Sequence, residues 1–174
     1  MKIISYIAAG AAAVAMLSAA TGHRKVTENK LSPTAETSIT LAGKTVTIEY
    51  NAPSARERKV EGGLIPFDSV WRLGADSATT LTTDTDLMIG DLKVPKGVYT
   101  LYLQGGATDW KLVVNKQTGQ WGTEYDASKD LGRVEMKVSK TLAFTETLKI
   151  ALRNPGVLDI TWGNSRAAVP VKAA

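Results

Sequence analysis

Alternation of apolar and polar residues with a period of two runs through most of the chain and constrains its fold more than any other feature. In residues 44–50, for example, Val46, Ile48 and Tyr50 fall on one face of an extended segment. Outside an apolar run at the N-terminus, no segment has a sustained apolar stripe with the 3.6-residue period of a helix. The sequence therefore predicts an all-β protein with antiparallel strands joined by short turns.

About ten short strands are expected, with turn signals every ~8 to 12 residues. The expected strands are 37–41, 44–50, 78–84, 86–89, 92–94, 98–103, 110–114, 134–138, 147–152, 157–162 and 168–171. Ala42-Gly43 and Gly105-Gly106 predict hairpin connections, and Pro170 predicts that the last strand lies at a sheet edge. Uneven strand lengths and a long crossover over 52–72 favour a two-sheet antiparallel β-sandwich, with a jelly roll as one form of it, over a closed barrel.

The N-terminus has the pattern of a secretory signal. Lys2 precedes an apolar run over residues 3–17, and small residues follow at 18–20, where signal peptidase would cleave. A retained anchor is the alternative, but the run is shorter than the ~20 residues of a membrane span. We expect a signal helix over 1–20, a polar linker over 21–34 and one β-sandwich domain over 35–174. The protein is expected to be exported, to the periplasm or the extracellular space, with no membrane span after cleavage.

Composition restricts the chemistry that the chain can perform. The sequence has no cysteine, and its one histidine, His23, follows the predicted cleavage point. Disulfides, thiolate nucleophiles, a Ser-His-Asp triad and a His-rich metal centre are therefore not expected, and no cofactor motif occurs. Asp84, Asp86 and Asp91 lack the glycine and closing glutamate of a calcium loop and are better interpreted as a hairpin turn. The net charge of +4 is spread along the chain without a basic stripe, so nucleic acid is not an expected partner.

Residues 62–84 (GGLIPFDSVWRLGADSATTLTTD) are the least regular stretch. Trp71 and Arg72 precede a Gly-Ala-Asp turn, so Arg72 could be set against Asp76 and aimed at a ligand. The same residues could instead fasten a long crossover, since such loops need internal polar anchoring. Upstream, Arg56 and Arg58 form a donor cluster that suits carboxylates or phosphates, or a solvated charged loop.

Aromatic residues on strands are expected in the core, whereas Trp121 lies in an expected loop and could border a cleft. The full set of expected ligand-binding residues is Arg56, Arg58, Trp71, Arg72, Asp76, Asn115 and Trp121. In this hypothesis Arg72 binds an acidic or hydroxyl group, Asp76 orients Arg72 and Trp121 stacks on the ligand. No catalytic or metal-binding residue is assigned.

Several motifs together suggest a family. The most specific are 62–67 (GGLIPF) and 70–75 (VWRLGA), with others at 46–54, 95–101 and 110–116. In these motifs the chain resembles the secreted bacterial family called domain of unknown function 2911, over roughly residues 31–162. The family usually has Asn and Glu where this chain has Asp76 and Ser77, so any role of that glutamate does not carry over. Its Lys-Gly-Arg-Lys stretch appears here as 55–59, without the glycine. The resemblance implies a β fold and export, but no reaction.

Three functions fit these observations. The first is an exported, non-catalytic module that binds a small polar, anionic or saccharide ligand or associates with the envelope. The second is a carboxylate-dependent hydrolase or lyase acting on a polar or saccharide substrate, with Asp76, Glu124 or Asp126 as acid or base. The third is a protein that works through its surface, which an exposed apolar patch or a long unpaired edge strand would support. The oligomeric state is left open.

Overall fold

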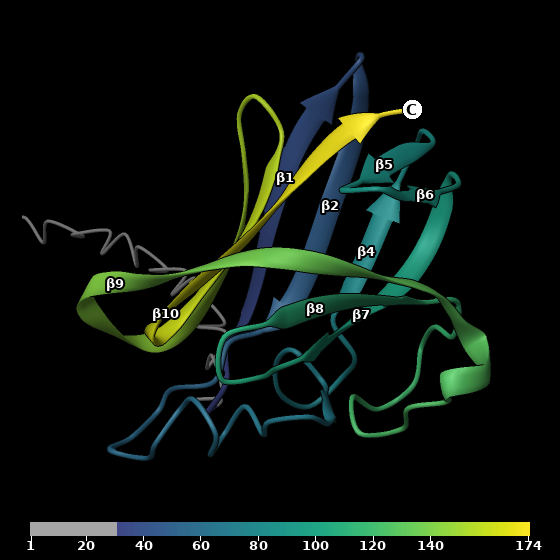
Figure 1. The fold of residues 1–174 in the computed structure, drawn as a ribbon. Helices are drawn as coiled ribbons and strands as arrows, with labels where there is room; N and C mark the ends of the chain where they lie inside the picture. Colours follow the sequence, from purple (N-terminus) through teal and green to yellow (C-terminus); the bar gives the residue numbers. More distant parts are fainter. Residues whose placement is uncertain (1–30) are drawn as a thin grey trace, which may run out of the picture.

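A computed structural model describes residues 31–174, and in it every strand pair is antiparallel (Figure 1). The all-β antiparallel prediction is confirmed. The predicted signal helix (1–20) and most of the predicted linker (21–34) lie outside the described residues, and the single domain over 35–174 stays a prediction. In the part of the chain that is described, the only helical element is one 3₁₀ turn, η1 (Ala127–Lys129), and no helix is long and apolar enough to cross a membrane.

Within residues 31–174 there are ten strands. They are β1 (Thr34–Leu41), β2 (Lys44–Asn51), β3 (Val70–Trp71), β4 (Thr80–Thr83), β5 (Leu87–Ile89), β6 (Leu92–Val94), β7 (Gly97–Gln104), β8 (Trp110–Asn115), β9 (Asp130–Arg153) and β10 (Val157–Ala173). Their order is β1-β2-β4-β7-β8-β9-β10-β5-β6, with β3 paired to β7. The predicted hairpins β1–β2 and β7–β8 are confirmed. The division into two sheets stays a prediction, because pairing connects these strands into one path.

Two long strands replace four predicted short ones. The predicted strands 134–138 and 147–152 are parts of β9, which has 24 residues, and 157–162 and 168–171 are parts of β10, which has 17. The prediction of an edge strand at 168–171 is wrong, since β10 pairs with β9 up to Ala168 and with β5 from Val171. Pro170 is tolerated because it falls between these two ladders, where its missing N–H interrupts neither.

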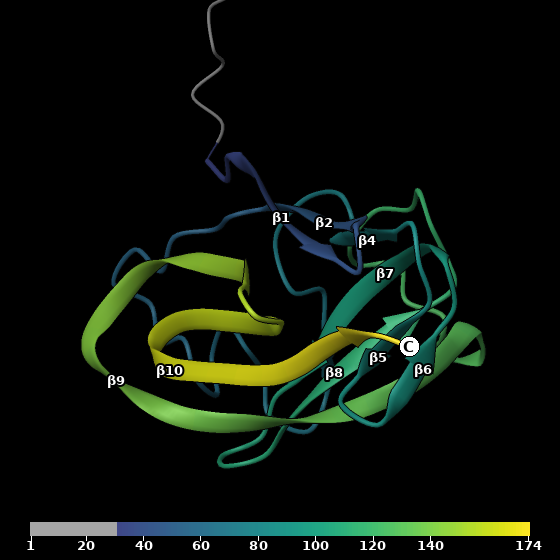
Figure 2. The ribbon, with the colours of Figure 1, turned by 90° about the horizontal axis from the view of Figure 1, so that it is seen from above.

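The paired strands β9 and β10 bend sharply together. Figure 2 shows β10 turning back on itself inside the arc of β9. From Thr161 to Ser165, β10 advances four residues while β9 advances nine, from Lys149 to Lys140. The outer strand needs more residues because it follows the longer path. Gly163 lies at the turn with a φ of +61°, and a Cβ there would come within 2.9 Å of a neighbouring side chain, so the bend requires glycine.

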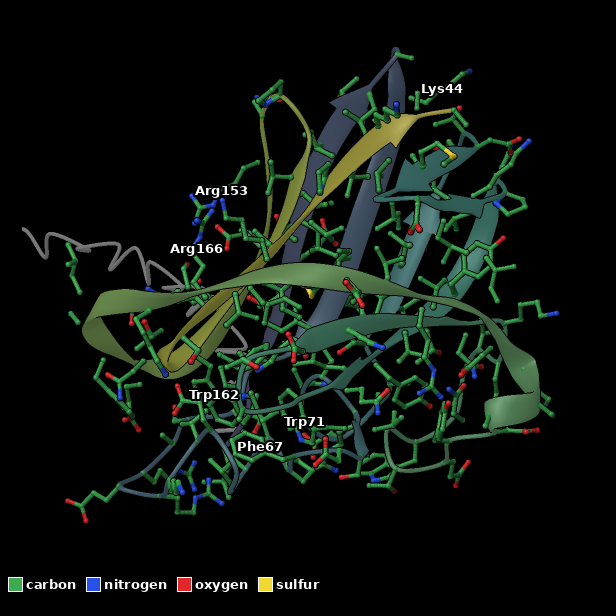
Figure 3. All side chains as sticks on the ribbon, viewed as in Figure 1. Lys44, Phe67, Trp71, Arg153, Trp162 and Arg166 are labelled. Carbon is green, nitrogen blue, oxygen red and sulfur yellow. The ribbon has the colours of Figure 1, made fainter. Side chains whose placement is uncertain are left out.

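A buried carboxylate fastens this bend. The side chain of Asp159 is 2% exposed, and it accepts hydrogen bonds from Arg153 Nε and Arg166 Nε, each at 2.8 Å. In a straight strand Asp159 and Arg166, seven residues apart, would be separated by about 23 Å. Their contact therefore exists because β10 doubles back. The two guanidinium groups lie side by side in Figure 3.

Glu61 holds the same bend from the crossover loop. Its Oε1 accepts hydrogen bonds from the Asn164 N–H at 2.9 Å and the Ser165 hydroxyl at 2.8 Å. Partial burial would raise the pKa of Glu61, but these hydrogen bonds, with the nearby charge of Lys140, hold it below its ordinary value of 4.5. The ionised form of Glu61 is therefore favoured in the folded protein.

The core fills the inside of the curved sheet. Side chains of β2, β7 and β8 meet those of β9 and β10 there, among them Ile48, Leu101, Leu112 and Ile160, which are all fully buried. A polar contact crosses the core as well, because the Tyr50 hydroxyl accepts from the N–H of Ile150 at 3.0 Å and donates to its carbonyl at 3.4 Å. This contact joins β2 to the C-terminal part of β9.

Replacing Asp159 by alanine is expected to lower the free energy of unfolding by about 2–3 kcal/mol, because two guanidinium groups lose their shared carboxylate. Arg153 and Arg166 are 61% and 45% exposed, so water compensates for part of the loss. Chemical denaturation measures the effect. The control Glu135→Gln breaks a surface pair with Lys111 at 4.0 Å and should cost under about 1 kcal/mol. Equal losses in the two variants would contradict the role of Asp159.

The lowered pKa of Glu61 predicts a dependence of stability on pH. A carboxyl group whose pKa is lower in the folded than in the unfolded state stabilises the fold above the unfolded value, and this contribution is lost as pH falls through the folded value. The free energy of unfolding of wild type should therefore exceed that of Glu61→Gln at a pH of about 6, and this difference should disappear as the pH falls to about 3. Denaturation curves over this range measure the difference, and a constant difference at every pH would refute the assignment.

Candidate functional site

A pocket of about 270 Å³ opens where the crossover loops meet the bend of β10. Its described lining comprises Leu31, Ser32, Pro53, Ser54, Arg56, Arg58, Leu64, Trp71, Arg72, Gly74, Ala75, Asp76 and Trp162. We call it the arginine pocket, after its three arginines. Those arginines face a single carboxylate, that of Asp76, among the described lining residues. The pocket therefore has an excess of positive charge, which favours anions.

Two stacked indoles form the flat apolar wall of the pocket. The ring centroids of Trp71 and Trp162 are 5.5 Å apart with an interplanar angle of 21°, and Figure 3 shows the two residues close together below the bend. Trp162 is buried, and its indole N–H donates to the Glu146 carbonyl at 3.0 Å. Because Trp162 directly precedes Gly163, the bend of β10 brings it against Trp71. Since Trp162 is buried, the face on which a flat ligand can pack belongs to the half-buried Trp71, which the stacking on Trp162 holds in place.

Arg72 is half-buried and held in one orientation. Its Nε donates to the Gly74 carbonyl at 3.1 Å. Its stem packs against Gly122, where a Cβ would lie 3.1 Å from Arg72 Cδ. Among the described residues, no hydrogen-bond partner takes its terminal amino groups, so most of its five N–H donors remain available to a ligand. The observed contact that orients Arg72 is with Gly74, and the expected orienting role of Asp76 stays a prediction.

The turn that carries Arg72 has a strained backbone. Leu73 and Asp76 have φ angles of +47° and +56°, a region that costs non-glycine residues about 1 kcal/mol or more. Hydrogen bonds enforce this conformation. Thr79 Oγ1 donates to the Leu73 carbonyl at 2.8 Å, and the Ala75 N–H donates to the Asn51 carbonyl at 3.2 Å. The turn is thus built into the end of β2, and strain of this kind clusters at ligand sites.

Arg56 and Arg58 line the mouth of the pocket from an exposed loop. Arg56 Nη2 donates to the Leu31 carbonyl at 3.0 Å, and Arg58 donates to two carbonyls of its own loop at 2.8 and 2.9 Å. Arg56 and Glu57 have φ angles of +50° and +62°, and the Arg56 N–H donates to the Glu146 carboxylate at 2.7 Å. Part of the donor capacity of these arginines therefore holds the loop, while both residues line the pocket.

The structure brings five of the seven predicted residues to this pocket, namely Arg56, Arg58, Trp71, Arg72 and Asp76. Asn115 does not line it, because its buried amide nitrogen donates to the Asp126 carbonyl at 2.9 Å and to Asp130 Oδ1 at 2.8 Å. Trp121 does not line it either, and it is half-exposed in a loop whose backbone pairs with Ser77. Their binding roles stay predictions without support from the pocket geometry.

Sequence reasoning missed Trp162 and Leu64 as pocket residues. Trp162 ends an alternating run and has the pattern of a core residue, so only the bend reveals its second role. Leu64 lies within the GGLIPF motif, which was assigned to the crossover and not to a site. The glycine that follows Trp162 was the one available signal, because glycine inside a strand often marks a bulge or sharp bend.

A second hollow, of about 340 Å³, shares Trp71 and Arg72 with the arginine pocket and is closed by Tyr102 and Tyr125. The two tyrosine rings meet edge to face, with centroids 4.8 Å apart. Burial raises the pKa of Tyr125, as does its 2.6 Å hydrogen bond to Asp130. The Tyr125 hydroxyl is therefore a fixed hydrogen-bond donor to Asp130, with a structural role.

The other candidate acids are not in the arginine pocket. Asp126 caps η1, where it accepts hydrogen bonds from the Ser128 hydroxyl at 2.6 Å and the Ser128 N–H at 3.0 Å, and these bonds lower its pKa. Glu124 does not line the pocket, and its carbonyl accepts from the Tyr102 hydroxyl at 3.2 Å. Within residues 31–174, no group of three or more His, Cys, Asp or Glu side chains could hold a metal ion.

A family model described as Protein of unknown function (DUF2911) matches residues 32–171. No curated protein and no solved structure matches the chain. The matched range includes every described residue of the arginine pocket except Leu31.

Proposed function

The chain belongs to the DUF2911 family of proteins of unknown function, as its motifs indicated, and we propose that it is an exported binding protein whose arginine pocket holds a small organic anion. The proposal joins three parts. Export follows from the predicted signal over residues 1–20. The parts of the curved sheet that face each other across the core act as the two layers of a sandwich. The ligand binds at the edge of these layers, where the crossover loops meet the bend.

The observation that carries the proposal is the convergence of three arginines beside a stacked tryptophan pair. Guanidinium groups bind carboxylates and phosphates through paired hydrogen bonds. Arg72 suits this role best, because it is half-buried and already oriented while its terminal amino groups remain available. A charged hydrogen bond of this kind contributes about 1.5–3 kcal/mol.

The size and wall of the pocket narrow the ligand class. A volume of about 270 Å³ falls just below the ~300–1,000 Å³ of drug-sized sites, so the ligand is small. Trp71, supported from behind by the buried Trp162 and flanked by Leu64, suits the flat face of an aromatic ring or a sugar ring. An aromatic carboxylate or a sugar acid combines such a face with the required negative charge.

The alternative of a carboxylate-dependent hydrolase or lyase has one supporting observation, the presence of Asp76 in the lining. Glycoside hydrolysis commonly uses two carboxyl groups across the bond that breaks, and the described lining contains one. The lowered pKa of Asp126 is the opposite of what a general acid needs near neutral pH. Binding without turnover is therefore the function we propose.

Calorimetry and thermal-shift measurements with benzoate, glucuronate and phosphate test the proposal, with benzamide and glucose as neutral counterparts. At least one of the anions should stabilise the protein, by about 2.7 kcal/mol at a concentration of 100 Kd, and the neutral compounds should not. Arg72→Ala should weaken binding at least about tenfold, because the lost charged hydrogen bonds are worth 1.5 kcal/mol or more.

Lys44→Ala is the matched control. It removes the same charge from the exposed first residue of β2, at the opposite end of the molecule from Trp71 in Figure 3. Binding by this variant should equal that of wild type. The proposal fails if no anion binds, or if Arg72→Ala and Lys44→Ala weaken binding equally while both remain folded.

A further inference from the structure

Part of one edge of β9 has no strand partner. β10 pairs along one edge, and on the other edge β8 pairs with β9 as far as Met136. The next backbone contact on that edge is the Ala55 N–H donating to the Glu146 carbonyl at 2.8 Å. Between these two points, no other described strand pairs with this edge. Residues 137–145 therefore present an open edge on the outer arc of the bend, facing away from the molecule in Figure 2.

The open edge carries exposed apolar side chains. Leu142 is fully exposed and Phe144 is 50% exposed, although both lie within a strand. They lie where β9 takes the longer outer path around the bend, beyond the core. Soluble proteins commonly protect such edges, because an unpaired apolar edge is a template for pairing with another chain.

The sequence of this edge is complementary to itself. Residues 140–146 read Lys-Thr-Leu-Ala-Phe-Thr-Glu. If two copies pair in antiparallel fashion with Ala143 at the centre, the facing pairs are Lys140 with the partner's Glu146, Thr141 with the partner's Thr145, and Leu142 with the partner's Phe144. Opposite charges, paired threonines and aromatic–aliphatic contacts are all favourable cross-strand pairs.

We propose that two copies of this protein associate through a two-fold antiparallel pairing of the open edge of β9 centred on Ala143, in which Glu146 contributes its carboxylate alone, because its carbonyl already accepts from the Ala55 N–H. A two-fold axis through Ala143 makes each favourable pair occur twice, as in any isologous interface. The inference is independent of the anion site. Because the edge is convex, only the apex can pair, so the ladder is short and the association depends on protein concentration.

The groups that the pairing needs are available. Glu146 uses Oε1 to accept from the Arg56 N–H, which leaves Oε2 for the lysine of the second copy. Lys140 is exposed, and although its charge lies near Glu61, it forms no ion pair among the described residues.

Sedimentation over a range of protein concentrations tests the proposal with a charge exchange. Wild type should form a dimer whose Kd rises at least about tenfold in Lys140→Glu and in Glu146→Lys, because like charges then face each other twice. The double variant K140E/E146K restores opposite charges and should associate like wild type. A mixture of the two single variants should form a mixed dimer. Lys137→Glu makes the same charge change outside the pairing segment and should leave the Kd unchanged.

Circular dichroism and thermal unfolding verify that each variant is folded. Since Glu146 also binds the Arg56 N–H, Leu142→Asp provides a variant at a fully exposed side chain, and it should abolish association without loss of folding. The proposal is overturned if wild type is monomeric up to about 1 mM. It is equally overturned if wild type forms a dimer whose Kd is the same in Lys140→Glu and Glu146→Lys, or if the double variant and the mixture fail to associate.

Discussion

The contact of Asp159 with Arg153 and Arg166 fixes the bend on which the rest of the structure depends. A strand of 17 residues would otherwise extend for about 55 Å and carry its ends far apart. The buried carboxylate instead joins two points of β10 across its turn, and Glu61 adds a second fastening from the crossover loop. These hydrogen-bonded carboxylates thus stabilise a bend that the alternation of apolar and polar residues along β10 does not specify.

One deformation produces both functional features. On the inside of the bend, Trp162 is brought against Trp71 and becomes the wall of the arginine pocket. On the outside, β9 needs more residues than β10 and lifts Leu142 and Phe144 away from the core. The pocket and the open edge are therefore two consequences of the same arc. A change that straightened the bend would affect both.

Local features were predictable from the sequence, and the bend was not. Glycine turns between alternating segments correctly predicted the hairpins β1–β2 and β7–β8, because such pairing is local. Lys140 and Glu146 stand at positions where the alternation calls for apolar residues, so one bent strand resembled two short ones, although Leu142 and Phe144 continue the alternation between them. Asp159 lies between Leu158 and Ile160, and its role depends on Arg166, which only folding brings near.

In the candidate site, too, some features were predictable from the sequence and others depended on the fold. Arg56, Arg58 and Arg72 were found because charged residues in loops lie at the surface, where ligands bind. Asn115 follows an expected strand and was predicted to face a ligand. Its amide nitrogen instead donates hydrogen bonds within the protein, to the Asp126 carbonyl and to the Asp130 carboxylate. Whether a polar side chain serves a ligand or the fold is decided by its partners in space, which one sequence does not reveal.

An NMR titration of side-chain N–H resonances tests the central claim most directly. With a small carboxylate such as benzoate, the Nε–H signal of Arg72 and the indole signals of Trp71 and Trp162 should shift together with a single Kd. The Nε–H signals of Arg153 and Arg166 should remain still, since Asp159 already holds them. Shifts that appear first at Arg153 and Arg166, or that spread evenly over the arginines, would contradict an anion site built by the bend.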